Sequence, residues 1–140
     1  MLNPFKDNIS QTLAIAERYK RERKDTDNAI KYAYMAAAMS FSPRADVCCM
    51  LGELYLEKRN LEWAMFWYEK AYGNTSLSLD ETDIDEDYYT IVPMLKLGFI
   101  NSLMGNNEKA LLYFKNVLAV RPDNKIAMDN IEAIEKEKTE

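Results

Sequence analysis

The sequence contains no histidine, and this absence removes the most common general base and metal ligand of enzymes. Other short signatures of catalysis are missing too: the 140 residues hold no nucleophile elbow, no phosphate-cradling glycine loop and no Cys-x-x-Cys spacing. We therefore expect a chain that is not an enzyme, with no catalytic, cofactor-binding or metal-binding residues and no cofactor.

Glycine and proline are scarce, with four of each, which predicts a nearly all-helical chain with short connections. No stretch approaches the roughly 20 apolar residues that span a bilayer. Near the start, Asn3, Lys6 and Asp7 interrupt anything like a signal peptide. The only cysteines, Cys48 and Cys49, are adjacent and so make a poor disulfide pair, which fits a reducing compartment. The prediction is a cytoplasmic protein without a membrane partner.

A concentrated basic cluster is also missing, and the formal net charge is -5. Nucleic-acid binding depends on neutralising phosphates, so this charge balance argues against it. The closest candidate is the stretch at residues 20–24, which falls at a predicted helix end, where cations complement the helix dipole. Glu22 and Asp25 dilute its charge. We expect no nucleic-acid partner.

What the sequence does contain is an internal repeat. A pattern of Leu-Gly followed by a small, an aromatic and a small or apolar residue occurs twice at a fixed offset of 46 residues. The first copy is Leu51, Gly52, Ala64, Tyr68 and Ala71, and the second is Leu97, Gly98, Ala110, Phe114 and Val117. These spacings predict two helices folded into an antiparallel hairpin, with the small residues where the backbones approach most closely.

A less complete third copy precedes these two. Ala29, Ala33 and Ala36 stand 35 residues before Ala64, Tyr68 and Ala71, and Asp25 or Asp27 can cap their helix. The predicted fold is therefore an all-α superhelix in one domain, residues 1–140. It has hairpins at about 8–41, 43–73 and 88–121 and a half-polar capping helix at about 124–138, started by Asp123 or Asn124.

An acidic segment, about residues 74–87, separates the second and third hairpins. Its Asp83-x-Asp85-x-Asp87 spacing suggests calcium, but Tyr88 and Met94 occupy the positions where the EF-hand pattern needs glycine and glutamate. So many carboxylates cannot be buried unpaired. We interpret the segment as a solvated surface loop and not as a metal site.

The repeat resembles the tetratricopeptide repeat. In the third hairpin, the positions of that family are filled by Leu97, Gly98, Gly105, Ala110, Phe114 and Pro122. The second hairpin matches from Leu51 to Ala71, although Arg59 replaces the turn glycine and Ser76 the closing proline. The resemblance covers roughly 110 of the 140 residues. It implies a scaffold that binds or positions other proteins.

A narrower resemblance concerns residues 43–52 (PRADVCCMLG) and 63–69 (WAMFWYE). They are similar to the repeat region that follows the catalytic domain in bacterial family-two glycosyltransferases. The pattern Asp87-Tyr88-Tyr89-x-x-x-Pro93 is similar to the end of that family's inter-repeat loop. This resemblance implies the C-terminal part of a bacterial enzyme, where the repeats orient the catalytic domain, an acceptor or a second subunit. The alternative is a free-standing adaptor.

Peptide-binding members of the repeat family use the groove formed by the first helix of each hairpin. The candidates here are Cys49, Glu53, Leu56, Val92, Leu95 and Phe99, flanked by Asp46 and Ser102. The family's carboxylate clamp requires Lys, Asn and Arg at such positions. These residues are mostly acidic or apolar, so an apolar peptide, helix or strand is the expected partner.

A second candidate surface is aromatic. Ala64, Tyr68 and Ala71 already account for the inward face of their helix, which leaves Trp63, Phe66 and Trp67 as a surplus. A neighbouring hairpin or the acidic loop can cover them, as aromatic stripes are usually core. They can instead contact another domain or subunit, including a second copy in a homodimer, because Trp and Tyr dominate buried contacts between proteins. Both alternatives stay open.

Overall fold

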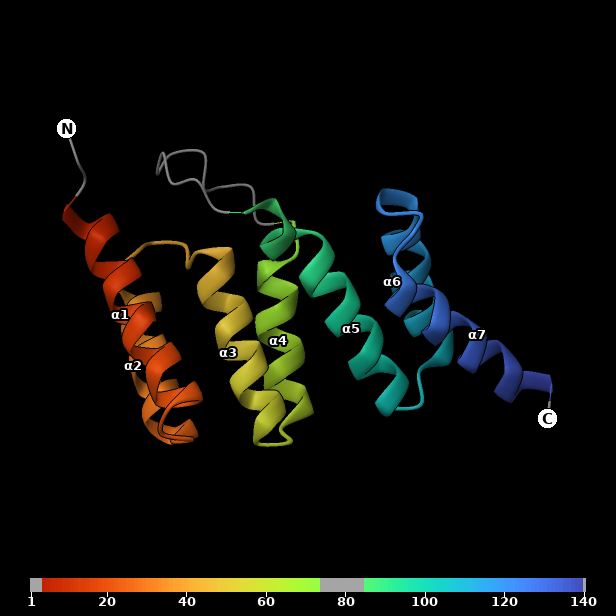
Figure 1. Cartoon of the computed structure of the whole chain (residues 1–140), viewed down its shortest axis with the longest axis horizontal. Coiled ribbons are helices and arrows are strands. Elements are labelled where there is room, and N and C mark those ends of the chain that lie inside the picture. Colours follow the sequence, from red (N-terminus) through yellow and green to blue (C-terminus); the bar gives the residue numbers. More distant parts are fainter. Residues whose placement is uncertain (1–3, 74–84, 140) are drawn as a thin grey trace.

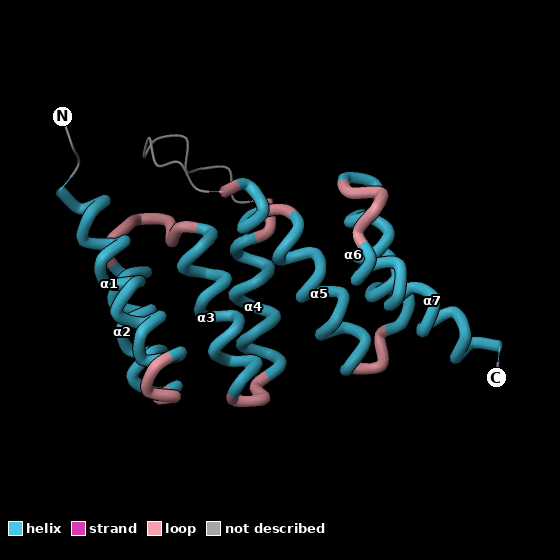
Figure 2. Tube along the Cα trace, viewed as in Figure 1, coloured by secondary structure: helices cyan, strands magenta, loops and turns pink. Residues whose placement is uncertain are grey.

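A computed structural model describes residues 4–73 and 85–139, and side chains from residue 8 onward. In this part of the chain every regular element is helical and no strand occurs (Figure 2). The first two hairpins comprise α1 (Pro4–Arg21), α2 (Thr26–Ala38), α3 (Ala45–Glu57) and α4 (Leu61–Ala71). A short 3-10 helix, η2 (Glu86–Tyr89), then precedes α5 (Ile91–Leu103), α6 (Asn107–Val120) and α7 (Lys125–Thr139).

The helices stack into an elongated array rather than a closed bundle (Figure 1). Helices α1 and α2, α3 and α4, and α5 and α6 pack as antiparallel hairpins. The second helix of each hairpin contacts the first helix of the next, and α7 covers α6. This arrangement confirms the predicted α-α superhelix of three hairpins and a C-terminal helix.

The repeated small and aromatic residues form the interior of the hairpins. At most 1% of each is exposed. They are Ala29, Ala33 and Ala36 in α2, Ala64, Tyr68 and Ala71 in α4, and Ala110, Phe114 and Val117 in α6. Burial of apolar surface is the main favourable term in folding, so this shared layer explains why the three hairpins have the same architecture.

The glycine of the repeat pattern in each of α3 and α5 lies under an aromatic ring of the partner helix. A Cβ atom built at Gly52 would lie 2.6 Å from Cε2 of Tyr68, and one built at Gly98 would lie 2.8 Å from Cε1 of Phe114. Both distances are too short for a real contact. The space that a side chain would need is therefore filled by a ring, where we had expected the opposing backbone.

The turns within the three hairpins share one backbone geometry. Each has a residue with positive φ: Lys24 at 53°, Arg59 at 60° and Gly105 at 82°. In all three, the next residue donates its backbone N–H to a carbonyl five or six residues earlier, at 2.8–2.9 Å. Arg59 therefore takes the left-handed conformation that the glycine takes in the third hairpin, which is strained for a residue with a Cβ.

Two of the predicted helix caps can now be assigned. Asp25, and not Asp27, caps α2: its Oδ1 accepts a hydrogen bond from the Asn28 backbone N–H at 3.1 Å. At the last helix, Asn124 Oδ1 accepts from the Ala127 N–H at 2.9 Å. Such caps satisfy backbone donors that the first turn of a helix leaves unpaired.

Most of the acidic loop, including Asp83, lies outside the described residues. The two ends of the loop region are held together, because the Gly73 N–H donates to the Tyr89 carbonyl at 2.8 Å. At the far end, Asp87 pairs with Arg121 at 3.0 Å. Within residues 4–73 and 85–139, no three His, Cys, Asp or Glu side chains gather as a metal site. In the same ranges, no helix has both the length and the apolar character needed to cross a bilayer.

Candidate protein-binding groove

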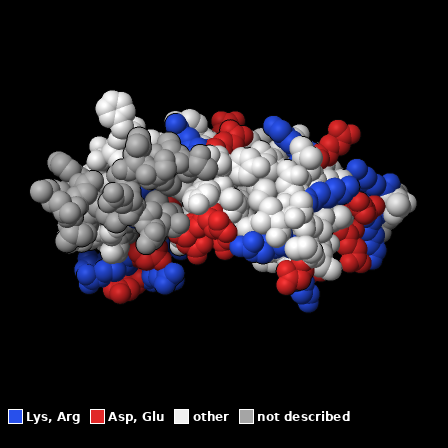
Figure 3. All heavy atoms as spheres, turned by 90° about the horizontal axis from the view of Figure 1, so that it is seen from above, with Lys and Arg blue, Asp and Glu red and all other residues white. Residues whose placement is uncertain are grey.

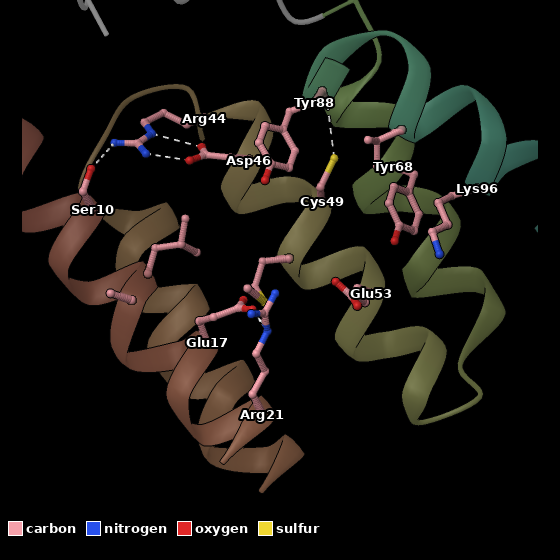
Figure 4. Close-up of a pocket in the computed structure, with 14 residues that line it drawn as sticks. Ser10, Glu17, Arg21, Arg44, Asp46, Cys49, Glu53, Tyr68, Tyr88 and Lys96 are labelled. Atoms are coloured by element: carbon pink, nitrogen blue, oxygen red, sulfur yellow. Dashed lines mark hydrogen bonds and ion pairs between the residues drawn. The ribbon is translucent and has the colours of Figure 1, made fainter. Parts of the chain in front are cut away.

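A pocket of about 480 Å³ opens between the first helices of the hairpins. Its walls come from α1, α3 and α5, while Tyr68 of α4 and Tyr88 of η2 complete it (Figure 4). We call the surface formed by α1, α3 and α5 the groove. The pocket is the part of the groove that connects all three hairpins.

One end of the pocket is organised by Arg44, which is only 5% exposed. Its Nε and Nη2 atoms donate to the two carboxylate oxygens of Asp46, at 3.0 and 2.6 Å. Its Nη1 atom donates to Ser10 Oγ at 3.1 Å. A buried guanidinium needs such partners, and this two-pronged ion pair provides them. Arg44 therefore joins the first hairpin to the second and has little charge left for a ligand.

Further along the groove, the charged side chains are also paired. Lys20 Nζ lies 2.8 Å from Glu53 Oε1 and 3.8 Å from Glu57 Oε1. The hydrogen bond that Lys20 donates to Glu53 raises the pKa of Lys20, against the opposing effect of burial. Arg21 forms an ion pair with Glu17 on the same helix. These contacts satisfy most of the charge between α1 and α3 within the chain itself.

Both cysteines are buried and chemically quiet. Cys49 is 5% exposed, and its Sγ donates to the Tyr88 carbonyl at 3.2 Å. Burial raises the pKa of the Cys49 thiol and raises that of Cys48 to about 12. A protonated thiol is a poor nucleophile and a poor metal ligand. In this site Cys49 therefore acts as a packing residue that ties α3 to η2.

The structure brings together three of the six predicted groove residues. Cys49, Glu53 and Val92 all line the pocket. Leu56 packs instead against the core of the first two hairpins, and Leu95 against the cluster formed by α5, α6 and α7. Phe99 is outside the pocket and 45% exposed.

Sequence reasoning missed several residues of this pocket. Lys96 and Tyr68 line it, as do Glu17 and Arg21 from α1. Lys96 lies one position beyond Leu95, so the expected helical face was drawn slightly too narrow. The α1 contribution had no sequence signal, because the first hairpin keeps only the small residues of its second helix.

The three predicted surface aromatics separate into two groups. Trp67 is only 7% exposed, so it is not itself a surface residue, whereas Trp63 is 47% and Phe66 40% exposed. Tyr34 of the first hairpin covers Trp67, with ring centroids 5.6 Å apart. The neighbouring hairpin thus covers Trp67 and leaves the other two rings open.

These rings belong to a closed circuit of five aromatic side chains. Centroid distances around it run from 5.2 to 6.5 Å, through Tyr34, Trp67, Phe66, Trp63 and Tyr55. The Tyr34 and Tyr55 hydroxyls are 2.9 Å apart, and burial together with this hydrogen bond raises the pKa of Tyr55 to about 12. Edge-on and stacked contacts of this kind are favourable, so the circuit is a connected aromatic patch at the join between hairpins one and two.

Charge is unevenly distributed along the molecule. Seen from above, acidic side chains gather near the middle, and a largely uncharged surface extends from there over α5 and α6 (Figure 3). Val92, Leu95 and Phe99 give the groove helix of this hairpin an apolar character. The groove therefore carries paired charges on α1 and α3, and on α5 it presents Val92, Lys96 and the exposed Phe99.

Comparison with known proteins identifies part of this architecture. Residues 45–75, which span α3 and α4, match the family model of the tetratricopeptide repeat. Hairpin two is a tetratricopeptide repeat. The match to that family is limited to this one hairpin, which is less than half of the chain.

Two crystal structures of MamA have the same overall fold. The TM-scores are 0.75 and 0.73, at 17% and 16% sequence identity. The aligned region covers 94% and 96% of this chain, and 69% and 66% of the MamA chains. No curated protein matches the chain by sequence. At such low identity the similarity to MamA shows the fold alone, and the glycosyltransferase resemblance stays a prediction.

Proposed function

We propose that this chain is a non-catalytic protein-interaction module that binds a segment of another protein in its groove. The observation that carries the proposal is the pocket of about 480 Å³ where the first helices of all three hairpins meet. Proteins that bind extended or helical segments use such grooves, with apolar side chains for affinity and a few polar groups for orientation.

The division of the groove suggests what the segment is like. Arg44, Lys20 and Arg21 are already paired with Asp46, Glu53 and Glu17. They offer no cluster of free cations for a clamp on a chain terminus. On α5, the exposed ring of Phe99 presents apolar surface. An apolar peptide or an amphipathic helix fits this combination best.

Absence of catalysis is part of the same proposal. The sequence has no histidine, and both thiols are held protonated by burial. Most of the ionised groups around the pocket are engaged in ion pairs, namely Arg44 with Asp46, Arg21 with Glu17 and Glu53 with Lys20. What supports the proposal is that these paired groups have little freedom for proton transfer.

Selection from a random peptide library tests the proposed groove. We expect the full 140-residue chain to enrich peptides, and Phe99→Asp to weaken the binding of the enriched peptides by about tenfold, which corresponds to about 1.4 kcal/mol. Leu112→Asp is the matched control, because Leu112 is in the same hairpin and 59% exposed but lies on α6. Failure to enrich any peptide, or equal loss in both variants, would refute the proposal.

As the wider context we propose the C-terminal region of a bacterial glycosyltransferase, with a free-standing adaptor as the alternative. The support is the similarity of residues 43–52, 63–69 and 87–93 to that family. We also propose a cytoplasmic location, on the ground of the two unpaired thiols. Sequencing the gene upstream of the Met1 codon decides between the contexts: an in-frame nucleotide-sugar domain supports the first, and a stop codon contradicts it.

The exposed aromatic rings favour a second interface. We propose that Trp63 and Phe66, supported by Tyr34 and the buried Trp67, contact the catalytic domain of the same protein, another subunit or a second copy. Trp63→Ser combined with Phe66→Ser should reduce self-association in sedimentation velocity if the contact is a homodimer. Leu112→Ser serves as the control, and an unchanged sedimentation coefficient of a dimeric wild type would exclude this surface.

A further inference from the structure

The hydroxyl of Tyr68 is an unexplained polar group in the pocket. Tyr68 is only 1% exposed and borders the pocket from α4. Among residues 4–73 and 85–139, none forms a hydrogen bond with this hydroxyl. Within the described part of the chain, the fully buried side-chain atoms without a hydrogen-bond partner are Trp67 Nε1 and Asn101 Oδ1, and the Tyr68 oxygen is not one of them. The hydroxyl therefore faces the pocket, where it can donate a hydrogen bond to a bound group. Burial also raises the pKa of Tyr68, which keeps the hydroxyl a protonated donor.

The third hairpin shows that packing is not the reason. Phe114 occupies the equivalent position on α6 and covers Gly98 as Tyr68 covers Gly52, with equivalent distances of 2.8 and 2.6 Å. Both rings are 1% exposed. A ring without a hydroxyl therefore fills this place in the repeat equally well, so packing does not require the oxygen of Tyr68.

Lys96 is the second unusual group in the same pocket. No acidic side chain of the described part of the chain forms an ion pair with it. The other charges that line the pocket are paired: Arg44 with Asp46, Arg21 with Glu17, and Glu53 with Lys20. The charged side chains that line the pocket are balanced, with Arg21, Arg44 and Lys96 against Glu17, Asp46 and Glu53, but Lys96 is the cation among them that has no ion-pair partner in the described residues. Figure 4 places Lys96 on the same side of the pocket as the Tyr68 ring.

We propose that Tyr68 and Lys96 together bind the carboxylate of an aspartate or glutamate side chain in the docked segment. A carboxylate is an acceptor-only group, and the pocket offers it a hydroxyl donor and an ammonium donor. The carboxylate of Glu53 is engaged by Lys20 at 2.8 Å, which reduces its repulsion of an incoming carboxylate. The inference rests on the proposed function and specifies which segments the groove accepts.

A side-chain carboxylate fits better than a chain terminus. The groove continues past Lys96 to the exposed Phe99 on α5. A segment whose acidic side chain reaches Lys96 can therefore run on and place apolar residues against Val92 and Phe99. The expected motif is an acidic residue flanked by apolar ones, within a chain that continues in both directions.

Peptide display tests this motif. Random peptides joined to the coat protein by their C-termini have no free terminal carboxylate, so any acidic preference comes from side chains. With the full 140-residue chain as bait, we expect enrichment of Asp or Glu next to apolar residues. With Lys96→Glu as bait, we expect that enrichment to vanish. For a selected acidic peptide, Tyr68→Phe and Lys96→Met should each weaken binding by about tenfold. Neither variant should alter binding of the same peptide with Gln in place of its acid.

The outcomes separate this inference from the proposed function. Enriched peptides without an acidic preference, or the same motifs with Lys96→Glu, would overturn the carboxylate site while the groove remains a binding site. A selection that yields no peptide would overturn both. Circular dichroism shows whether each variant is folded, and Tyr68→Phe is the safest of them, because a phenylalanine already fills the equivalent place in hairpin three.

A small-molecule titration gives an independent readout. Butyrate resembles a glutamate side chain, and butyramide is its neutral counterpart of nearly equal size. In NMR spectra of the full chain, butyrate should shift the backbone amides of Val92 and Lys96, and Lys96→Met should reduce the shifts at Val92 severalfold. Butyramide should leave them unchanged. Equal shifts with both compounds, or none with either, would contradict a charge-selective site.

Discussion

Hairpins two and three are built on one frame and present different surfaces. In both, a glycine of the first helix lies under an aromatic ring of the second, and the same left-handed turn joins the helices. Outside this frame they differ: hairpin two presents Asp46 and Glu53 in the groove, whereas hairpin three presents Val92, Lys96 and the exposed Phe99. The comparison shows that the repeat specifies packing and leaves the groove free to diverge.

The strongest way to break this equivalence is to remove the rings. Tyr68→Ala and Phe114→Ala should each lower the free energy of unfolding by about 3–5 kcal/mol, because each leaves a large cavity in a buried layer. Urea denaturation followed by circular dichroism measures the loss. Leu112→Ala on the exposed side of α6 is the control and should change stability by less than about 0.5 kcal/mol. A loss confined to one ring would show that the two hairpins are not equivalent.

Substitutions of the two glycines test the same packing between glycine and ring. Gly52→Ala and Gly98→Ala should each destabilise the fold by about 1–3 kcal/mol, although alanine is the better helix former. The reason is that a Cβ would lie 2.6 or 2.8 Å from the covering ring. Chemical denaturation of both variants measures it.

A smaller ring should relieve this clash. Combining Gly98→Ala with Phe114→Leu should therefore be less destabilising than the sum of the two single changes. Strictly additive losses would mean that the glycine is required for some reason other than the ring.

The turns within the hairpins extend the comparison. Only hairpin three has a glycine, Gly105, at the position with positive φ, whereas the other two have Lys24 and Arg59. Arg59→Gly should stabilise the fold by up to about 1 kcal/mol by relieving the strain at φ 60°, and Lys24→Gly should act in the same direction. Gly105→Ala should lower stability by about 1 kcal/mol. Thermal unfolding compares the three variants, and a destabilising Arg59→Gly would show that the arginine side chain has a role of its own.

The smallest expected effect concerns the charged groove of hairpin two. The pKa of Lys20 is raised in the folded chain, mainly by the hydrogen bond to Glu53. Its stabilising contribution should therefore be complete below the ordinary pKa of 10.5 and be lost as pH rises through the higher folded value. Lys20→Met should lower stability by less than about 1 kcal/mol at neutral pH, and the difference from wild type should shrink above pH 10.5.

Arg18→Met provides the control for this titration, because Arg18 pairs with Glu22 at 3.9 Å with both side chains largely exposed. Its difference from wild type should be near zero at every pH. A Lys20→Met difference that grows on raising the pH would contradict the assignment of the favourable pair to Lys20 and Glu53.

The fold could be predicted because its cause repeats in the sequence. Ala64, Tyr68 and Ala71 recur at fixed offsets, and each member of the pattern is buried for the same packing reason. The turn at Arg59 was also readable, since its position matches Gly105. Because the same positions are buried in each hairpin, small and aromatic residues recur at regular spacing in the sequence. Three copies make this pattern easy to recognise.

The site could be predicted only in part, because its chemistry does not repeat. The repeat pattern predicts an inward-facing core position for Tyr68, and nothing in the pattern indicates that its hydroxyl borders a pocket. Lys96 lies one position beyond Leu95, outside the helical face of α5 that was expected to point into the groove. Trp67 and Trp63 look alike in sequence, yet Tyr34 of another hairpin covers only the first. These features depend on contacts between hairpins, which the order of residues within one hairpin does not encode.

The hydrogen bond between Gly73 and Tyr89 has a consequence for how chains of this type can vary. The backbone leaves the stack and rejoins it at nearly one point, since those two residues are 2.8 Å apart at N and O. The length of the segment between Gly73 and Tyr89 should therefore not affect the pitch of the superhelix. Lengthening a loop adds only a slowly growing entropic term. We expect this junction to tolerate inserts of widely different size, even a whole foreign domain, without disturbing the hairpins on either side.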